Sequence, residues 1–340
     1  TIMEVVRRTA LFFQPQIRTK IMNEGWACLG RDTPVFTERG LLTMEELVAG
    51  EEASQVFDGE SVQTVYDRNI IRNHETIRVR TRRGLDVTGS NNHRVLLADR
   101  VTWKRLDELQ PGDMLAVSGG QNLWPTDPVR IYWYLPARLS LSEVAQMAGV
   151  SIDTVLRYRS GRNIRRQQEV SAALACYEDE ANQKLSTSLA SRCVVRLPEV
   201  VDERLAAFVG YLVGDGHISR AKHHLGLTTG DAPQAEAFAR LSSDLFGLSA
   251  SVTSDGGRLR ILLHSETLSD FLVDGLGLTS GPSAREKQIP KAILRSPRVV
   301  VSAFLRAYFD CDGYAGKQGV ILSTVSDRLA EQVQLLLLNF

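Results

Sequence analysis

Two stretches decide the fold of the last third of the chain: Leu205-Ala-Ala-Phe-Val-Gly-Tyr-Leu-Val-Gly-Asp-Gly216 and Ser302-Ala-Phe-Leu-Arg-Ala-Tyr-Phe-Asp-Cys-Asp-Gly313. They align at an offset of 97 residues and carry small residues at every fourth position, namely Ala206, Gly210, Gly214 and Ala303, Ala307, Cys311. Residues four apart lie on one face of a helix, where small side chains let two backbones approach closely. The pattern predicts two packed helices that bring Asp215 and Asp312 side by side.

A turn after a helix is the simpler explanation of a single Asp-Gly, because Gly commonly follows a helix end. It does not explain why both helices share the same face of small residues. Paired carboxylates instead favour a site for a hard divalent cation such as Mg²⁺, which activates water and stabilises the leaving oxygen in phosphodiester hydrolysis.

The two stretches, together with Lys287-Gln-Ile-Pro290, resemble the twin motifs of LAGLIDADG homing endonucleases. The resemblance implies an α+β domain of two pseudo-symmetric halves over residues 198–340, acting on double-stranded DNA of the host gene without its insert. It also implies Asp215 and Asp312 as ligands of the metal and Lys287 as the basic residue near the scissile phosphate. A solvated surface lysine is an equal alternative for Lys287. After Asp312 the pattern predicts only a strand over 319–324 and a helix over 327–338, so the second half is expected to be incomplete.

The chain from Cys28 to Val117 has a different texture, with short β-prone runs such as 62–66, 76–79 and 94–97. Turn signals separate these runs at Asp58-Gly59, Arg83-Gly84 and Pro111-Gly112-Asp113. The pattern predicts an all-β module over residues 28–122. Residues 1–27 share no pattern with it and are expected to belong to a different, host protein.

Three blocks of this module resemble the Hint fold of inteins: one from Cys28 with 40–47, one over 84–97, and one over 106–113. The resemblance implies that the Cys28 thiol attacks the Ala27 carbonyl, and that the His93 imidazole protonates the departing nitrogen. Ser90, where the family usually has Thr, would position these groups with Asn91 and Asn92. Outside such blocks, Cys28 would more often be a small buried residue and His93 a core histidine.

A third pattern, over 136–190, predicts a helical insert with the layout of a helix-turn-helix, in which Gly149 forms the turn and Val150 and Val155 pack inward. Between 137 and 166 there are six Arg against one Glu and one Asp. A helical hairpin with a solvated charged face is the alternative. The residues predicted to contact DNA are Ser151, which also caps the second helix, Asp153, Thr154, Arg157, Tyr158, Arg159, Arg162, Arg165 and Arg166.

The composition sets limits on the whole chain of 340 residues, which is expected to be multidomain. Forty Lys and Arg balance 40 Asp and Glu, so any basic surface for nucleic acid must be local. Four isolated cysteines indicate no zinc ribbon or disulfide framework, and Cys176, Cys193 and Cys311 are interpreted as packing residues. No apolar stretch reaches the length of a membrane span, so a cytoplasmic protein without a membrane partner is expected.

Both ends of the chain resemble cut ends, and no His-Asn ending that splicing would require is present. The sequence therefore predicts the first acyl shift at Ala27-Cys28, with flanking exteins in cis as partners and no cofactor, but no ligation. Two alternatives stay open at this level. One is a splicing element whose nuclease has decayed, and the other is a DNA-binding regulator that combines a LAGLIDADG-like fold with a helix-turn-helix.

Overall fold

The structure is a computed structural model that describes residues 28–50, 54–65, 67–133, 141–159, 161–183, 195–219, 224–281, 284–317 and 319–340. The predicted host segment 1–27 lies outside these residues. The chain forms two compact units. The first comprises the described residues up to Val129, the segment Val200–Gly214 and the residues from 284 to 340, and the second comprises Arg130–Glu199 and Asp215–Pro282.

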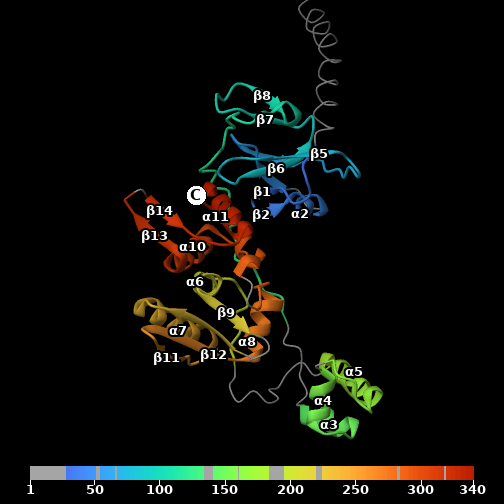
Figure 1. Ribbon diagram of the computed structural model, residues 1–340. Helices are drawn as coiled ribbons and strands as arrows, with labels where there is room; N and C mark the ends of the chain where they lie inside the picture. The colour runs from blue at the N-terminus through green and yellow to red at the C-terminus, as the bar shows by residue number, and fades with distance from the viewer. Residues whose placement is uncertain are drawn as a thin grey trace, which may run out of the picture. The chain divides into compact units, whose positions relative to one another are not determined.

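The first unit begins with a module built mainly from short antiparallel strands (Figure 1). Its strands are β1 (Pro34–Thr37), β2 (Gly40–Thr43), β3 (Ser54–Phe57), β4 (Val62–Val65), β5 (Thr76–Arg80), β6 (Asp86–Ser90), β7 (Arg94–Leu96) and β8 (Trp103–Arg105). Four of them form a sheet in the order β2-β1-β3-β4, and the others pair as the hairpins β5–β6 and β7–β8. The predicted β runs are thus confirmed. The module is not all-β, since it also contains the helix α2 (Met44–Ala49) and the 3₁₀ turn η1 (Leu106–Glu108).

Helix α2 starts at a complete capping box. The Thr43 side chain accepts a hydrogen bond from the Glu46 backbone N–H, and the Glu46 carboxylate accepts one from the Thr43 N–H. This arrangement satisfies two backbone donors that a helix start leaves open. It also fixes the direction of the Glu46 side chain.

The two predicted motif helices are present and pack against each other within the first unit. They are α6 (Glu203–Val213) and α10 (Arg298–Asp312). After α10 come the hairpin β13 (Gly313–Gly316) and β14 (Gly319–Leu322) and the helix α11 (Asp327–Asn339), and before it come η3 (Ala284–Glu286) and α9 (Lys291–Leu294). Strand β13 has no counterpart in the sequence-based prediction, because its four residues include two glycines.

The second unit contains an antiparallel sheet in the order β11-β12-β10-β9. Its elements are β9 (Gly216–Ser219), β10 (His224–Thr229), α7 (Ala232–Phe246), β11 (Ser251–Asp255), β12 (Arg258–His264), α8 (Glu266–Asp270) and the π-helical turn η2 (Phe271–Gly275). One face carries the buried residues Leu225, Leu227, Ile261 and Leu263, and α7 packs on the strands β10 and β12 (Figure 1). The order helix, strand, strand, helix is therefore found twice, as α6-β9-β10-α7 and as α10-β13-β14-α11. This confirms the internal repeat at the level of elements.

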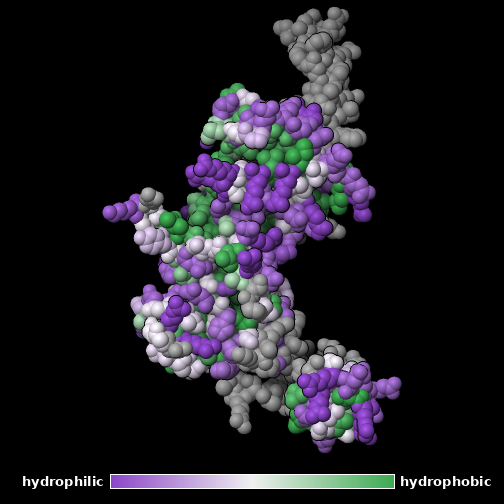
Figure 2. Space-filling model, viewed as in Figure 1, coloured by the Kyte–Doolittle hydropathy of each residue, from purple (hydrophilic) through white to green (hydrophobic). Residues whose placement is uncertain are grey.

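The helical insert also belongs to the second unit and consists of α3 (Leu141–Ala148), α4 (Ile152–Arg159) and α5 (Gln167–Gln183). Gly149, with φ 60°, forms the turn between α3 and α4, and the buried core contains Val144, Ala145, Ala148, Val155, Val170 and Ala173. The inward packing predicted for Val150 and Val155 is confirmed. The part of the insert visible in Figure 2 is largely hydrophilic with apolar patches.

The chain enters and leaves this insert along paired backbone segments. In the first unit the Val201 N–H donates to the Val129 carbonyl at 2.9 Å, and in the second unit the Ile131 N–H donates to the Glu199 carbonyl at 2.8 Å. Among the described residues, no helix combines the length and the apolar character that crossing a membrane demands.

Candidate functional site

The end of β6 holds Cys28 through its backbone. The Cys28 N–H donates to the Ser90 hydroxyl at 3.0 Å, and the Ser90 N–H donates to the Cys28 carbonyl at 2.8 Å. Leu29 bridges Gly89, and the Gly30 N–H donates to the Thr88 carbonyl at 2.7 Å, so residues 28–30 run antiparallel to β6. Ser90 is fully buried, and Cys28 is a free, half-buried thiol. The nitrogen of the predicted scissile bond is therefore fixed by Ser90.

His93 lies beside this junction. Its backbone N–H donates to the Ser90 carbonyl at 3.0 Å, and its own carbonyl accepts from the Leu106 N–H at 2.8 Å. A Cβ placed on Gly89 would lie 3.0 Å from the Cys28 carbonyl oxygen and 3.3 Å from the His93 Cβ. The two residues are thus neighbours over a glycine, and only a residue without a side chain allows this approach.

The His93 ring is half-buried, and burial lowers its pKa. Its Nδ1 atom is buried and accepts or donates no hydrogen bond among the described residues, and the same holds for the Asn92 Oδ1 atom. A buried polar atom without a partner is costly, and such atoms concentrate at functional sites. Asn91 contributes its backbone carbonyl, which accepts from the Asp107 N–H at 3.2 Å.

The helices α6 and α10 touch through their small residues. A Cβ on Gly210 would lie 2.5 Å from the Phe304 carbonyl oxygen and 2.9 Å from the Ala307 Cβ. A Cβ on Gly214 would lie 2.4 Å from the Cys311 Cβ. These distances leave no room for a larger residue, so the predicted close approach of the two faces is confirmed. Cys311 is a packing residue here, as predicted, whereas the side chains of Cys176 and Cys193 lie outside the described residues.

Lys287 reaches the point where the two motif helices end. Its ammonium donates to the Gly214 carbonyl at 2.5 Å, and its charge acts on the Asp312 carboxyl. Burial raises the pKa of Asp312, while Lys287 and the Tyr308 hydroxyl oppose the rise. A cation at two helix C-termini is also favoured by the helix dipoles. This position favours the site role of Lys287 over the solvated surface alternative.

Asp215 directly follows Gly214 and precedes β9 in the second unit. Its pairing with Asp312 stays a prediction. Within the described residues no group of three or more His, Cys, Asp or Glu could hold a metal ion. This donor set fits Mg²⁺, which is usually bound through one or two carboxylates and keeps several waters, better than a metal that needs a complete protein cage. The half-buried Asp312 carboxylate, whose burial disfavours its charge, would gain from a nearby cation.

The residues predicted to contact DNA from the insert have different environments. Ser151 caps α4, since its hydroxyl accepts from the Thr154 N–H at 3.3 Å and lies 2.9 Å from the Thr154 hydroxyl. Asp153 and Arg157 pair at 2.8 Å on the exposed surface of α4. The side chain of Arg159 lies outside the described residues.

Two predictions for the insert are corrected. Tyr158 is half-buried and packs against the core of the insert instead of facing outward, because one helical turn separates it from the buried Val155. Arg166 donates to the Gly149 carbonyl at 3.0 Å and so fastens the turn. Arg162 and Arg165 are exposed and described with no such contact, and their role toward DNA stays a prediction.

A polar sheet face has no counterpart in the sequence-based prediction. On the strands β9, β10 and β12, the residues that alternate with the buried ones are His217, Ser219, His224, Thr228, Arg258, Arg260 and His264. The three histidine rings lie in a row, with centroids 5.4 and 5.9 Å apart. The alternation in β12, Arg-Leu-Arg-Ile-Leu-Leu-His, carries the signal that could have revealed this face.

Comparisons with known proteins find two family matches. Residues 300–340, which cover almost all of α10 and the whole of α11, match the LAGLIDADG-like domain. Residues 1–63 match the SpoVR-like protein family. The chain is therefore similar to a homing-endonuclease type of domain at one end and to another protein at the other.

Curated relatives match parts of the chain. The small subunit of replication factor C from Methanocaldococcus jannaschii is 34% identical over 174 residues, which are 48% of this chain and 9% of that protein. The large A component of the A-type ATP synthase from Pyrococcus abyssi is 32% identical over 138 residues, 40% of this chain and 13% of that protein. The glutamine–fructose-6-phosphate aminotransferase of M. jannaschii is 26% identical over 149 residues, 43% of this chain and 13% of that protein. The chain thus spans only a small part of each of these relatives.

Proposed function

We propose that the chain is part of an intein that carries a LAGLIDADG homing endonuclease, and that Cys28 performs the first step of splicing on the Ala27-Cys28 bond. The observation that carries this proposal is the double hydrogen bond between Ser90 and Cys28, with the unpartnered Nδ1 of the buried His93 beside it. A structural cysteine needs no such arrangement.

The chemistry follows from these positions. At neutral pH the lowered pKa keeps His93 uncharged, so its imidazole can take the thiol proton of Cys28. Sulfur then attacks the Ala27 carbonyl carbon, the bond from that carbon to the Cys28 nitrogen breaks, and the imidazolium returns the proton to this nitrogen. The Ser90 hydroxyl lies on the same nitrogen and holds it in place. The product is a thioester between Ala27 and Cys28.

The relatives support an inserted element. Their names describe a replication factor, an ATP synthase and an aminotransferase, yet each shares 9–13% of its length with 40–48% of this chain. A segment that recurs within proteins of such different function is expected of a mobile insert rather than of a host domain.

We infer further that the host is a SpoVR-like protein. The match over residues 1–63 begins in the predicted host segment and continues beyond Cys28. The junction is nevertheless placed at Cys28, because residues 28–30 pair with β6 and because β1 and β3 belong to one sheet. Residues 28–63 are structurally part of the β module.

The nuclease part of the proposal rests on the LAGLIDADG-like match and on the ends of α6 and α10. Bound Mg²⁺ would activate water and stabilise the leaving phosphate oxygen. In this chain Asp215 and Asp312 would hold the metal, and Lys287 would supply positive charge near the scissile phosphate. The polar face of β9, β10 and β12, together with Arg157, Arg162 and Arg165 of the insert, would contact double-stranded DNA.

Thiol-induced cleavage tests the splicing proposal. Dithiothreitol should attack the thioester of the purified chain and release residues 1–27, as measured by mass spectrometry. Cys28→Ala should abolish release. His93→Ala should slow it by about 10²–10⁴-fold, the usual contribution of a general acid–base group. Ser90→Ala should slow it less, because it removes only a positioning contact.

Cys311→Ala is the matched control, since it removes a half-buried thiol far along the chain and should leave cleavage unchanged. Unchanged release from the Cys28→Ala variant would refute the assignment.

A further inference from the structure

The segment that carries Lys287 is held from one side by α11. The Ser326 hydroxyl donates to the Lys287 carbonyl at 2.7 Å, and the Ile289 N–H donates to the Gln332 Oε1 atom at 2.8 Å. The Arg328 Nε atom also donates to the Gln288 side chain at 3.1 Å. These contacts fix the backbone of 287–289, but they do not reach α9, the helix that follows.

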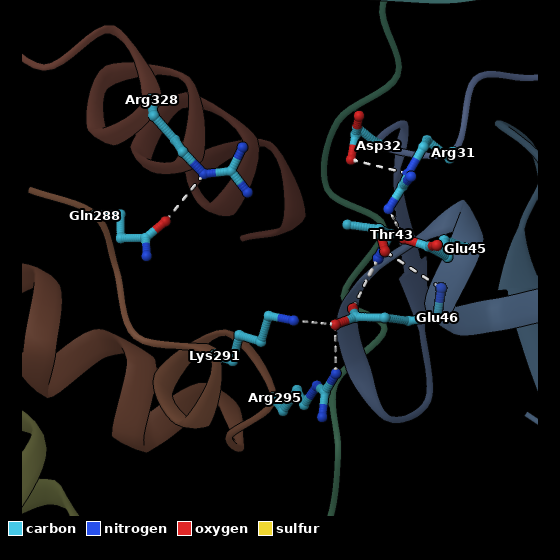
Figure 3. A network of polar contacts seen from close by, with 9 residues as sticks. All are labelled: Arg31, Asp32, Thr43, Glu45, Glu46, Gln288, Lys291, Arg295 and Arg328. Carbon is cyan, nitrogen blue, oxygen red and sulfur yellow. Dashed lines mark hydrogen bonds and ion pairs between the residues drawn. The ribbon is translucent and has the colours of Figure 1, made fainter. Parts of the chain in front are cut away.

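The β module holds α9 from the other side. The Glu46 Oε1 atom lies 2.6 Å from the Lys291 Nζ atom and 2.9 Å from an Arg295 guanidinium nitrogen, as Figure 3 shows. The hairpin turn at Gly40 presses on the same helix, since a Cβ there would lie 2.4 Å from the Leu294 carbonyl oxygen. One glutamate therefore bridges both ends of α9 from a different part of the chain.

We propose that Glu46 is a positioning residue that docks the β module on α9 and so holds Lys287 at the ends of the motif helices. Its meaning for DNA cleavage rests on the proposed function, whereas the docking itself does not. The interface extends along α11, where the Gln334 side chain donates to the Arg83 carbonyl at 3.1 Å. It reaches Asn339, whose amide group donates to the Leu123 carbonyl at 2.8 Å and accepts from the Leu123 N–H at 3.2 Å.

Exposure distinguishes this ion pair from ordinary surface pairs. The Glu46 side chain is 23% exposed, whereas the neighbouring Glu45, which pairs with Arg31, is 53% exposed. Burial by itself would raise the pKa of Glu46, but the hydrogen bonds from Lys291 and Thr43 and the charge of Arg295 lower it to about 2. The ionised carboxylate is thus stabilised by the partners that α9 supplies.

A simpler explanation is that Glu46 only completes the cap of α2. Glutamine also serves at this position of a capping box, so Glu46→Gln removes the charge while it leaves the cap possible. Thr43→Ala removes the cap and leaves the ion pairs. The two variants separate the explanations.

Hydrogen exchange followed by mass spectrometry on the full chain tests the proposal. Glu46→Gln should increase exchange within residues 287–295 by about fivefold at pH 7, because α9 loses its tie to the β module. Lys291→Gln combined with Arg295→Gln should have the same effect from the opposite side. Glu45→Gln, which makes the same change in charge one residue away, should leave exchange there unchanged, and so should Thr43→Ala.

The effect should also depend on pH. Because the pKa of Glu46 is lowered in the folded protein, its contribution is complete above the unfolded value of 4.5 and is lost as pH falls toward about 2. The difference between wild type and Glu46→Gln should shrink over that range.

Equal exchange in wild type and Glu46→Gln at pH 7, or an equal increase in Glu45→Gln, would overturn the proposal. Exchange needs no nuclease activity, so a chain that fails to cut DNA leaves this result interpretable.

Discussion

Ser90 shows how much one residue can fix at a reacting bond. It accepts from the Cys28 N–H and donates to the Cys28 carbonyl, and its own carbonyl anchors His93. Threonine would supply the same hydroxyl with an added methyl group, which a fully buried site would have to accommodate. The serine thus keeps the hydroxyl in place where the family usually has Thr.

Asp312 should cost stability. Its pKa is raised by burial, so its ionised form is disfavoured in the folded state at neutral pH. We expect Asp312→Asn to raise the melting temperature by about 1–3 °C at pH 7, and this gain should fade as pH falls and the wild-type carboxyl is protonated. Differential scanning calorimetry measures both.

Asp310→Asn is the control for this prediction, because Asp310 is exposed and lies on the same helix. In the full-length protein Asp312→Asn should also abolish Mg²⁺-dependent nicking of plasmid with the uninterrupted host gene. A loss of stability on Asp312→Asn would show that the carboxylate has a structural role instead.

At the scale of elements, the contact of α6 with α10 depends on glycine. Gly210→Ala would place a methyl group 2.5 Å from the Phe304 carbonyl oxygen, which is a backbone atom and cannot rotate away. Overpacking of this kind should lower the free energy of unfolding by about 1–3 kcal/mol, measured by urea denaturation.

Gly230→Ala serves as the comparison, because nothing lies within 4 Å of a Cβ at that position. Its effect should be much smaller. If both variants lost the same stability, the two helices would not be in close contact.

Elements with a strong local pattern could be predicted from the sequence. The motif helices, the strands after turn signals and the helices of the insert all follow from periodicity, because burial of one face imposes a period of two or 3.6. Strand β13 could not be predicted, since β-propensity is weak in Gly-Tyr-Ala-Gly.

Contacts between distant residues could be predicted only where a motif implied them. Cys28, Ser90 and His93 come together as the resemblance implied, and so do Lys287 and the ends of the motif helices. The inward packing of Tyr158 was missed because helical position alone does not separate a half-buried residue from an exposed one. The Glu46 contact with α9 has no local signal, because it joins residues 245 positions apart.

At the scale of the molecule, the helical insert should contribute DNA affinity and little else. Replacing residues 141–183 by a Gly-Ser linker should leave thiol-induced cleavage unchanged. It should weaken binding to duplex DNA and reduce the slope of log Kd against log salt by about 2–3, because roughly one unit is lost for each phosphate contact removed. Fluorescence anisotropy over a salt series measures this slope.

Arg162→Gln with Arg165→Gln tests the same contribution without removing the fold of the insert, and should give part of the loss. A slope unchanged by both alterations would show that the insert does not touch DNA.

The backbone pairs that join Val129 to Val201 and Ile131 to Glu199 have an evolutionary consequence. A chain that departs and returns at one place can gain or lose everything in between by a single recombination event, without a change in the strand order of the remainder. The insert could therefore have been acquired after the other parts were already working together, and a lineage that shed it would keep them intact.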